Sequence, residues 1–541
     1  MSVQGESASY DGIIIGAGQH GLILGSYLAK AGLRIALLER RATYGGGLST
    51  EERTLPGFKH NLHSINHFNI TATPWFRDLQ LAAKVPYVVP RYEFGQPHAD
   101  GSALVFSRDL DETLASIARF SPQDAKTFRE WNAVAEEMTQ RIFLQERFSE
   151  PLTADMREEL LSASGIGREF LALTKRQPGE VVEELFTDER VKVLFLFKLS
   201  LFGTVLHETL GTSSPLGSLI RAFDLATGYE LCEGGSFNLA RGLMDCFLAA
   251  GGHYLDQAQV DRITVDNGRA SGVELADGRR LAASSFVAST VDVHQTFEDL
   301  IGRDQIPAAV QAKLDAFHYT DWTLFGVHLA LDEPPNYTSS GFDPHINEVL
   351  KYNIGSETIA SLTQAHEDVE NGRVPRNVQF GAGSLTVLDP SQAPEGKHTA
   401  YAWHVVPWAP GGDHENLREL KEPLTEAILE KWRSYAPNMA GANILGTYTY
   451  TAYEYSKEIT NMRQGDIFMG ALSSDQVMDK HFGYRTGIDG LYLAGSATHP
   501  NGAITGGSGY ISAGLIAEDL GLTPWWQPLD ARTELSRLPR G

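Results

Sequence analysis

Residues 12–39 read GIIIGAGQHGLILGSYLAKAGLRIALLE and decide the fold of the chain. The stretch opens on an apolar run, 12–15, which is typical of a buried parallel strand. After the glycines, apolar residues recur at helical spacing from Leu22 to Ala31, and Gly32 stands where a helix C-cap glycine belongs. A second apolar run ends on Glu39. The pattern predicts a strand–helix–strand unit of a parallel sheet, and hence an α/β fold.

The turn between the first strand and the helix carries a GxGxxG motif at Gly16, Gly18 and Gly21. The first glycine permits the turn, the second lets a pyrophosphate approach the backbone, and the third lets the helix pack closely on the strand. Glu39 follows Gly16 by 39 − 16 = 23 residues, where an acidic residue accepts hydrogen bonds from a ribose 2′-OH. Its charge would repel a 2′-phosphate, which disfavours NADP. The constellation predicts a dinucleotide site.

Two further glycine-rich segments favour FAD as that dinucleotide. The first follows Glu39 directly, and its backbone would wrap a cofactor longer than AMP. Its candidate cofactor contacts are Arg40, Gly46, Gly47 and Leu48. The second is a strand at 490–495, a turn that contains Gly507, and a small-residue helix at about 508–519. That helix N-terminus would stabilise negative charge on a reduced flavin.

The composition is that of an ordinary globular protein, with 541 residues of which 42% are hydrophobic and 21% charged. A net charge of −23 would repel phosphate backbones, so nucleic acid is not an expected partner. The two cysteines, Cys232 and Cys246, form no CxxC pair, which excludes a dithiol redox centre. A second GxGxxG in a strand–helix context is also absent from the sequence, so a pyridine-nucleotide disulfide reductase is excluded.

The first ten residues are polar and lack the basic and apolar segments of a signal peptide. The most apolar stretch, 193–206, is interrupted by Lys198 and Ser200 and is too short to span a bilayer. We therefore expect a cytoplasmic protein. The stretch is interpreted as a core helix, with a wall of a substrate tunnel or a peripheral membrane contact as the alternative.

Blocks of helical and strand-like pattern predict two interleaved domains. An FAD-binding domain is expected from residues 1–90, 225–320 and 475–541, and an α+β substrate domain from residues 91–224 and 321–474. Helices are expected over about 109–220, and a polar surface loop at 365–376. Strands are expected at 263–265, 271–275, 286–290, 322–331, 378–388 and 399–407.

The opening unit and the second glycine motif resemble FAD-dependent oxidoreductases of the phytoene desaturase-like group, within the flavin amine oxidase superfamily. Three other stretches match that group in order: EGGS at 233–236, DPSQAPEGKH at 389–398 and LYLAGSATHP at 491–500. GFKH at 57–60 and SINH at 64–67 are most similar to its bacterial carotene ketolase and dehydrogenase branch.

The resemblance implies FAD as the cofactor, held by a Rossmann-like domain. It also implies that the backbone of Val260 contacts the adenine and that Gly495 and Ser496 lie along the ribityl-phosphate. The sequence departs from the family at Leu48, where an arginine is usual. It has Ser496 where amine oxidases usually place an acid, which favours the desaturase-like branch.

Histidines are the near-neutral bases in the motif segments. His60, His63 and His67 have the spacing i, i+3, i+7, which would place them on one face of a helix. No acid or cysteine cluster accompanies them in the sequence, so we expect no metal site, and a structural role competes with a flavin-facing one. The candidate catalytic residues are His63 and His499, which precedes Pro500 in the flavin turn.

The expected reaction is hydride transfer from an apolar, isoprenoid or otherwise unsaturated substrate to flavin N5. A quinone or O2 would accept the electrons. A flavin-dependent amine oxidase, a redox-neutral FAD-dependent isomerase or hydratase, and a non-catalytic FAD-binding protein are the alternatives. Because an allylic or conjugated cation needs little acid–base help, we expect the flavin turn to matter more than any single base.

Overall fold

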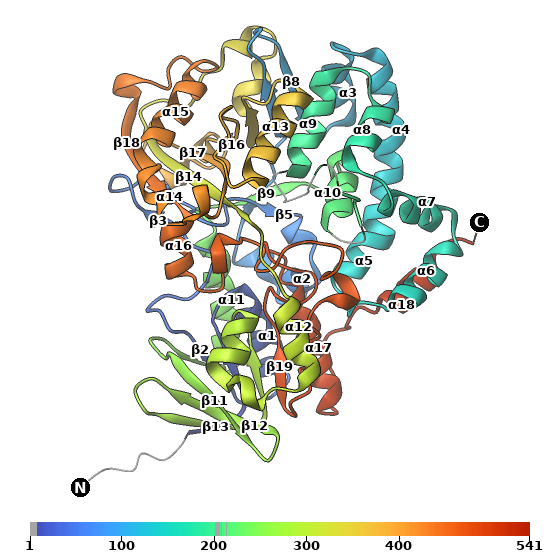
Figure 1. Ribbon diagram of the computed structural model, residues 1–541, viewed down its shortest axis with the longest axis vertical. Coiled ribbons are helices and arrows are strands. Elements are labelled where there is room, and N and C mark those ends of the chain that lie inside the picture. The colour runs from blue at the N-terminus through green and yellow to red at the C-terminus, as the bar shows by residue number, and fades with distance from the viewer. Residues whose placement is uncertain (1–7, 201–205, 207, 212–213, 541) are drawn as a thin grey trace.

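The computed structural model describes residues 8–540 except 201–205, 207 and 212–213. It is built around two seven-stranded sheets. Figure 1 shows the first sheet in the lower half of the molecule, the second at the upper left and a layer of helices at the upper right. The predicted α/β class is confirmed.

The first sheet contains the predicted strand–helix–strand unit. Its strands are β1 (Ala8–Ile15), β2 (Ile35–Leu38), β10 (His253–Leu255), β11 (Val260–Asp266), β12 (Arg269–Leu275), β13 (Arg280–Ser289) and β19 (Leu491–Leu493). The order is β10-β2-β1-β13-β12-β11, and β19 also pairs with β13. β10, β2, β1, β13 and β19 are parallel, whereas β12 pairs antiparallel with β13 and β11 pairs antiparallel with β12. Because Ile15 pairs with Leu38, the Gly16 turn and Glu39 emerge side by side.

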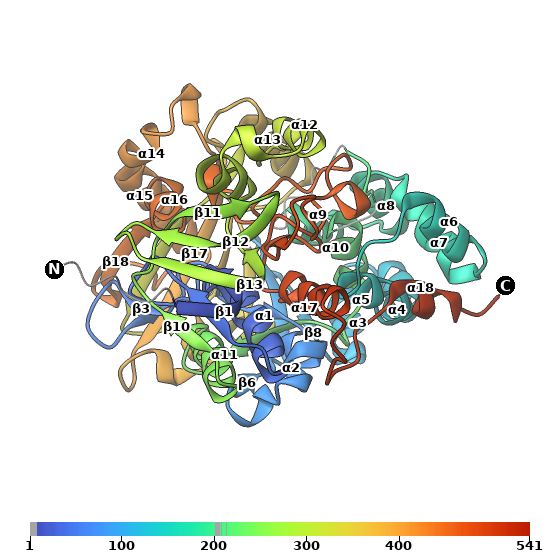
Figure 2. The ribbon, with the colours of Figure 1, turned by 90° about the horizontal axis from the view of Figure 1, so that it is seen from below.

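Three helices pack together against this sheet: α1 (Gln19–Lys30), α11 (Phe237–Ala249) and α17 (Gly507–Asp519). α1 is buried from Gln19 to Ala29 because α11 and α17 both pack on it, and Figure 2 shows α1 and α17 adjacent. Gly32 has φ +96° and its N–H donates to Ala29 O at 2.9 Å, which confirms the predicted C-cap. Trp525 stacks on Tyr27 of α1, 5.1 Å between centroids, and fixes the C-terminal tail.

The second sheet has the order β18-β14-β17-β16-β15-β7-β8. Its strands are β7 (Tyr92–Pro97), β8 (Ala103–Ser107), β14 (Trp322–Leu331), β15 (Lys351–Ile354), β16 (Phe380–Gly383), β17 (His398–Pro407) and β18 (Ile444–Tyr450). β14 and β17 confirm the strands predicted at 322–331 and 399–407. Only part of the strand predicted at 378–388 forms, because a 3-10 turn at Leu385–Val387 follows β16.

The surface loop predicted at 365–376 is wrong over its first half, which belongs to helix α13 (Ile359–Glu370). Thr358 caps this helix by accepting from the Ser361 N–H at 3.1 Å. Leu362, Ala365 and Val369 are buried at helical spacing, whereas the other residues are mostly polar. A polar segment with one narrow apolar stripe has the composition of a loop, although the stripe is enough to pack a helix.

The helical layer confirms the helices predicted over 109–220. It comprises α3 (Leu110–Ala118), α4 (Pro122–Met138), a π-helical turn (Thr139–Phe143), α5 (Leu144–Arg147), α6 (Ala154–Ser162), α7 (Gly165–Thr174), α8 (Pro178–Leu185), α9 (Glu189–Ser200) and α10 (Ser214–Phe223). The apolar stretch 193–206 begins in α9, where residues 193–200 are buried, and its residues 201–205 lie outside the described part. In the part of the chain that the structure describes, no helix combines the length and apolar character needed to cross a bilayer.

Shorter elements join these layers. They are β3 (Glu51–Glu52), β4 (Lys59–His60), β5 (His67–Phe68), β6 (Tyr87–Val88), β9 (Tyr229–Cys232), α2 (Pro74–Asp78), α12 (Ala308–Ala316), α14 (Asn416–Glu419), α15 (Lys421–Arg433), α16 (Ala452–Glu458) and α18 (Ala531–Ser536). β9 pairs with β5 and β6 in a small separate sheet. The domain boundaries given above stay a prediction.

Candidate active site

A cavity of about 340 Å³ is lined by the first sheet, the second sheet and the helical layer together. Its walls come from the turns after β1 and β2, the segment 63–68, the helix ends at 143–147, the loop at 458–469 and the turn at 499–505. Segments that are distant in the sequence therefore meet here, including those that carry most of the predicted site residues.

The glycine turn after β1 leaves no space for a side chain at Gly16 or at Gly21. Gly16 has φ +97°, and a Cβ on Gly21 would lie 2.0 Å from the carbonyl oxygen of Gly16. On the facing glycine cluster, a Cβ on Gly46 would lie 3.2 Å from Cα of Gly18. The two loops therefore form a cradle with backbone walls, which an extended phosphate-bearing group can approach closely. This cradle fits the FAD that the sequence predicts.

Glu39 ends β2 at the rim of this cradle. Its carboxylate accepts from the Ala17 N–H at 3.2 Å and from the Arg41 N–H at 3.0 Å. These bonds hold the carboxylate beside the glycine turn, and its remaining lone pairs are available to hydroxyl donors. Arg40 also lines the cavity, but its guanidinium donates to the carbonyl oxygen of Glu458. Arg40 thus ties the 458–469 loop to the cradle, and its contact with a cofactor stays a prediction.

The predicted cofactor contacts divide into two groups. Those that line the cavity are Gly16, Gly18, Glu39, Arg40, Gly46, Gly47, Val260 and Ser496. Gly21, Gly495 and Gly507 are not part of the wall and serve close packing instead: a Cβ on Gly495 would lie 2.5 Å from Thr290 O. The expectation for Leu48 is corrected, because its side chain is fully buried in the core of the first sheet and does not face the cavity.

Two polar side chains that the sequence reasoning missed also line the cavity. Gln19 and His20 fill the variable positions of the GxGxxG motif, and Gln19 Nε2 donates to Ala503 O at 2.7 Å. The Gly509 N–H of α17 donates to His20 Nδ1 at 3.3 Å. Gln19 Oε1 and His20 Nε2 are buried without a hydrogen-bond partner among the described residues. Such atoms fit a site that a polar ligand completes. Their position inside the motif is the signal that could have identified them.

Both candidate catalytic histidines line the cavity, and both are neutral at physiological pH. His499 Nε2 lies 2.8 Å from Glu146 O, and burial lowers the pKa of His499 to about 4. His63 Nε2 lies 3.4 Å from the Tyr450 hydroxyl. Burial, and then the charges of Arg41 and Arg53, lower its pKa to about 3. Neither histidine is arranged as a base that titrates near pH 7.

The one-face arrangement of His60, His63 and His67 is wrong. His60 lies in β4, His67 lies in β5, and the chain between them bends without forming a helix. Within the described ranges, no group of three or more histidine, cysteine, aspartate and glutamate side chains is placed to hold a metal ion. The i, i+3, i+7 spacing indicates one helix face only if the segment is helical, and here two short strands and a turn carry the three histidines.

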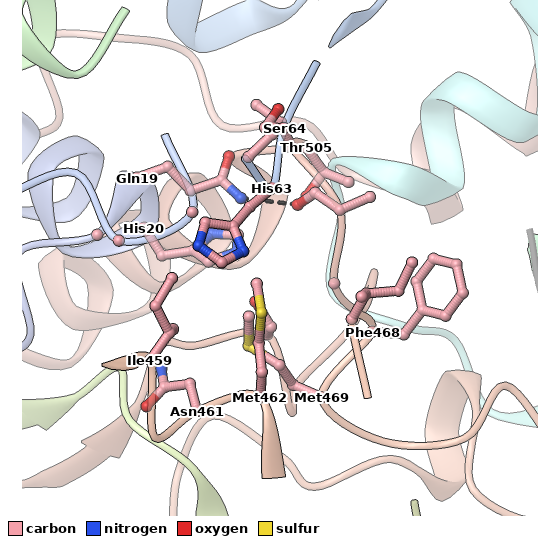
Figure 3. Close-up of a pocket in the computed structure, with 18 of the residues that line it drawn as sticks. Gln19, His20, His63, Ser64, Ile459, Asn461, Met462, Phe468, Met469 and Thr505 are labelled. Atoms are coloured by element: carbon pink, nitrogen blue, oxygen red, sulfur yellow. Dashed lines mark hydrogen bonds between the residues drawn. The ribbon is translucent and has the colours of Figure 1, made fainter. Parts of the chain in front are cut away.

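One wall of the cavity, formed by the second sheet and the 458–469 loop, is predominantly apolar. It contains Leu324, Tyr401, Trp403, Ile459, Met462, Ile467, Phe468 and Met469. Figure 3 shows Met462 and Met469 pointing into the same space as His63 and Gln19. Thioether and aliphatic side chains adapt to irregular apolar ligands, so this wall suits a hydrocarbon.

Comparison with known families gives one broad match. The family described as flavin-containing amine oxidoreductase matches residues 21–519. A limonene dehydrogenase subunit of Castellaniella defragrans is 30% identical over 96% of this chain and 96% of its own length. A lycopene-forming phytoene desaturase of a Paracoccus species is 26% identical over 95% of this chain and 98% of its own length.

Solved structures agree on the fold. A putrescine oxidase variant superposes with a TM-score of 0.60 at 14% identity, covering 96% of this chain and all of the other. An oxidoreductase of Methanosarcina mazei gives a TM-score of 0.54 at 19% identity, covering 94% of this chain and 99% of the other. At these identities the likeness concerns the fold alone.

Proposed function

Because the chain belongs to the flavin-containing amine oxidoreductase family and is an FAD-dependent oxidoreductase, we propose that it dehydrogenates an apolar, unsaturated substrate of isoprenoid type. The strongest support for this proposal is the apolar wall of the second sheet, which lines the same cavity as the glycine cradle. The names of two relatives, a limonene dehydrogenase subunit and a phytoene desaturase, point to the same substrate class.

We assign the FAD to the cradle. Gly16, Gly18 and Gly46 would admit its pyrophosphate, Glu39 would hold its ribose, and Val260 and Ser496 would contact it farther along the cavity. Gln19 Oε1 and His20 Nε2 are two buried polar atoms beside the cradle that have no hydrogen-bond partner among the described residues. When bound, FAD supplies the acceptor of two electrons that dehydrogenation requires.

The protein itself orients the substrate and keeps water out of the cavity. The apolar wall orients a hydrocarbon and excludes water, which protects a reactive carbon centre from solvent. The neutral imidazoles of His63 and His499 add no positive charge beside it. This arrangement suits a reaction that depends on positioning the substrate against the flavin rather than on proton transfer.

The amine oxidase alternative is disfavoured by charge. Arg147, Arg221 and Lys351 line the same cavity, and a protonated amine would enter against all three. A quinone or O2 is the proposed final acceptor, since the sequence has neither a second dinucleotide motif nor a CxxC pair to receive the electrons. Peripheral contact with a membrane that supplies such a quinone stays a prediction.

Anaerobic bleaching of the bound flavin tests this function. We expect farnesene or farnesol to remove the visible flavin absorbance of the holoenzyme, because their allylic C–H bonds give a stabilised cation. Farnesylamine, of equal chain length, should bind and bleach poorly because of its charge. Bleaching by the amine with no response to the hydrocarbon or the alcohol would establish the amine oxidase alternative instead.

The histidines should have a limited and pH-independent effect on this reaction. His63→Ala and His499→Ala should each slow anaerobic flavin reduction by at most about 10²- to 10⁴-fold. Because burial lowers both pKa values, to about 3 and about 4, the imidazoles bind protons only as the pH falls through that range. The pH profile of kcat/KM should therefore show no acid limb near pH 6.5. An acid limb there that disappears in His63→Ala would identify a catalytic base.

A further inference from the structure

Part of the cavity is cationic, in contrast to its apolar wall, and the cations come from the helical layer and from β15 of the second sheet. Arg147 ends α5, Arg221 lies on α10 and Lys351 begins β15, and all three line the cavity. The function proposed above uses these side chains only to exclude amines. Their grouping at one place requires a further explanation.

The cations are held together by aromatic rings. The Arg221 guanidinium lies 4.4 Å from the centroid of Phe68 and 5.4 Å from that of Phe143. Arg147 lies over the same two rings, at 5.7 and 5.6 Å. The ring of Tyr229, 5.8 Å from Phe68, carries the ammonium of Lys351 at 4.2 Å. Arg221 is fixed further by hydrogen bonds from Nε to Gly217 O at 3.0 Å and from Nη2 to Ser218 Oγ at 2.9 Å. Cation–π contacts and hydrogen bonds of this kind position the charges.

The cluster is charged at neutral pH in spite of its burial. Lys351 is only 7% exposed, and burial lowers its pKa to about 8. Burial, and then the charge of Arg221, lower the pKa of Arg147 to about 9. Both groups therefore remain predominantly protonated at pH 7, with mutual repulsion that an added anion would relieve.

Two acidic groups, Glu93 and Glu146, lie near this cluster. Glu93 acts on Arg221, on Lys351 and on Lys198, a further buried cation of α9. Glu146 lines the cavity, but its carboxylate is bound at both oxygens by Arg157, with Nη2 to Oε2 at 3.0 Å. Glu146 is thus already paired with Arg157, and Glu93 is shared among several cations.

We propose that Arg147, Arg221 and Lys351 bind the anionic head group, a carboxylate or a phosphate monoester, of an amphipathic substrate whose unsaturated chain lies along the apolar wall. This inference rests on the proposed function and narrows its substrate class from a hydrocarbon to an isoprenoid acid or phosphate. A guanidinium group can donate to two oxygens of a carboxylate or of a phosphate at once, and charge-assisted hydrogen bonds formed away from water are the strong ones. The head group would also fix the register of the chain in the cavity.

Equilibrium binding to the oxidised holoenzyme tests the proposal without turnover. The ligands are hexahydrofarnesoate, the matching alcohol and the phosphate monoester of that alcohol, which share one saturated chain. Calorimetry should show at least one of the two anions binding about tenfold or more tighter than the alcohol. Which anion binds tighter distinguishes a carboxylate from a phosphate substrate.

Two variants test the cations: the single substitution Lys351→Met, and the double variant that combines Arg221→Met with Lys351→Met. Both should lose the preference for the anions over the alcohol while they retain FAD. Lys351→Arg should keep it, and Arg418→Met, an exposed position on α14, is the matched control. Equal binding of anions and alcohol in the wild type would overturn the proposal, and so would loss of FAD in the charge variants, which would assign the cations to the cofactor. If farnesene still bleaches the flavin in that case, the proposed function stands and only this inference fails.

Discussion

Gly507→Val should abolish FAD binding or activity. Gly507 begins α17, and a Cβ there would lie 2.6 Å from Cδ of Pro500 and 3.0 Å from the carbonyl oxygen of Arg147. Neither atom belongs to a flexible side-chain end, so the turn at 499–505 would have to move. That turn lines the cavity, and its displacement would remove the cofactor site or misplace its far end.

The flavin content of the purified variant and its anaerobic reduction measure this effect. Gly514→Val is the matched control on the same helix, since its Cβ has ordinary contacts, the nearest at 3.5 Å to Pro528. A β-branched residue there should cost less than about 1 kcal/mol of stability. Full flavin content and normal reduction in Gly507→Val would show that the turn is not the flavin site.

Glu39→Ala should weaken FAD binding by about 2–4 kcal/mol, or about 30- to 1,000-fold, because two charge-assisted bonds to the ribose are lost. The carboxylate also accepts from the Ala17 and Arg41 N–H groups, so Glu39→Gln, which keeps an acceptor oxygen, should lose less. Titration of the folded apoprotein with FAD gives the affinity. Glu426→Ala, an exposed position on α15, is the control. Unchanged affinity in Glu39→Ala would mean that the ribose lies elsewhere.

The sequence predicted the nucleotide unit because its signals are local. Strand, glycine turn, helix and Glu39 follow one another within 12–39, so hydrophobic period and glycine spacing locate them directly. The strands at 322–331 and 399–407 were predictable for the same reason. The second half of the helix at Ile359–Glu370 was missed because Ala365 and Val369 are its only apolar residues.

The substrate side of the cavity could not be predicted in this way. No local sequence pattern marks Arg147, Arg221 and Lys351, which are far apart along the chain. They come together only because α5, α10 and β15 line the same cavity. The neutrality of His63 and His499 also depends on burial that tertiary structure creates. Leu48 lies in the second glycine motif, but its side chain packs in the hydrophobic core of the first sheet.

An anaerobic single turnover distinguishes dehydrogenation in this cavity from isomerisation or hydration. Holoenzyme is mixed with an excess of the unsaturated isoprenoid that bleaches its flavin, and the product is analysed by mass spectrometry. For a dehydrogenase we expect one product molecule per FAD reduced, lighter than the substrate by two hydrogen atoms. A product of unchanged mass, or one heavier by a water molecule, formed while the flavin stays oxidised would contradict it and establish an isomerase or a hydratase.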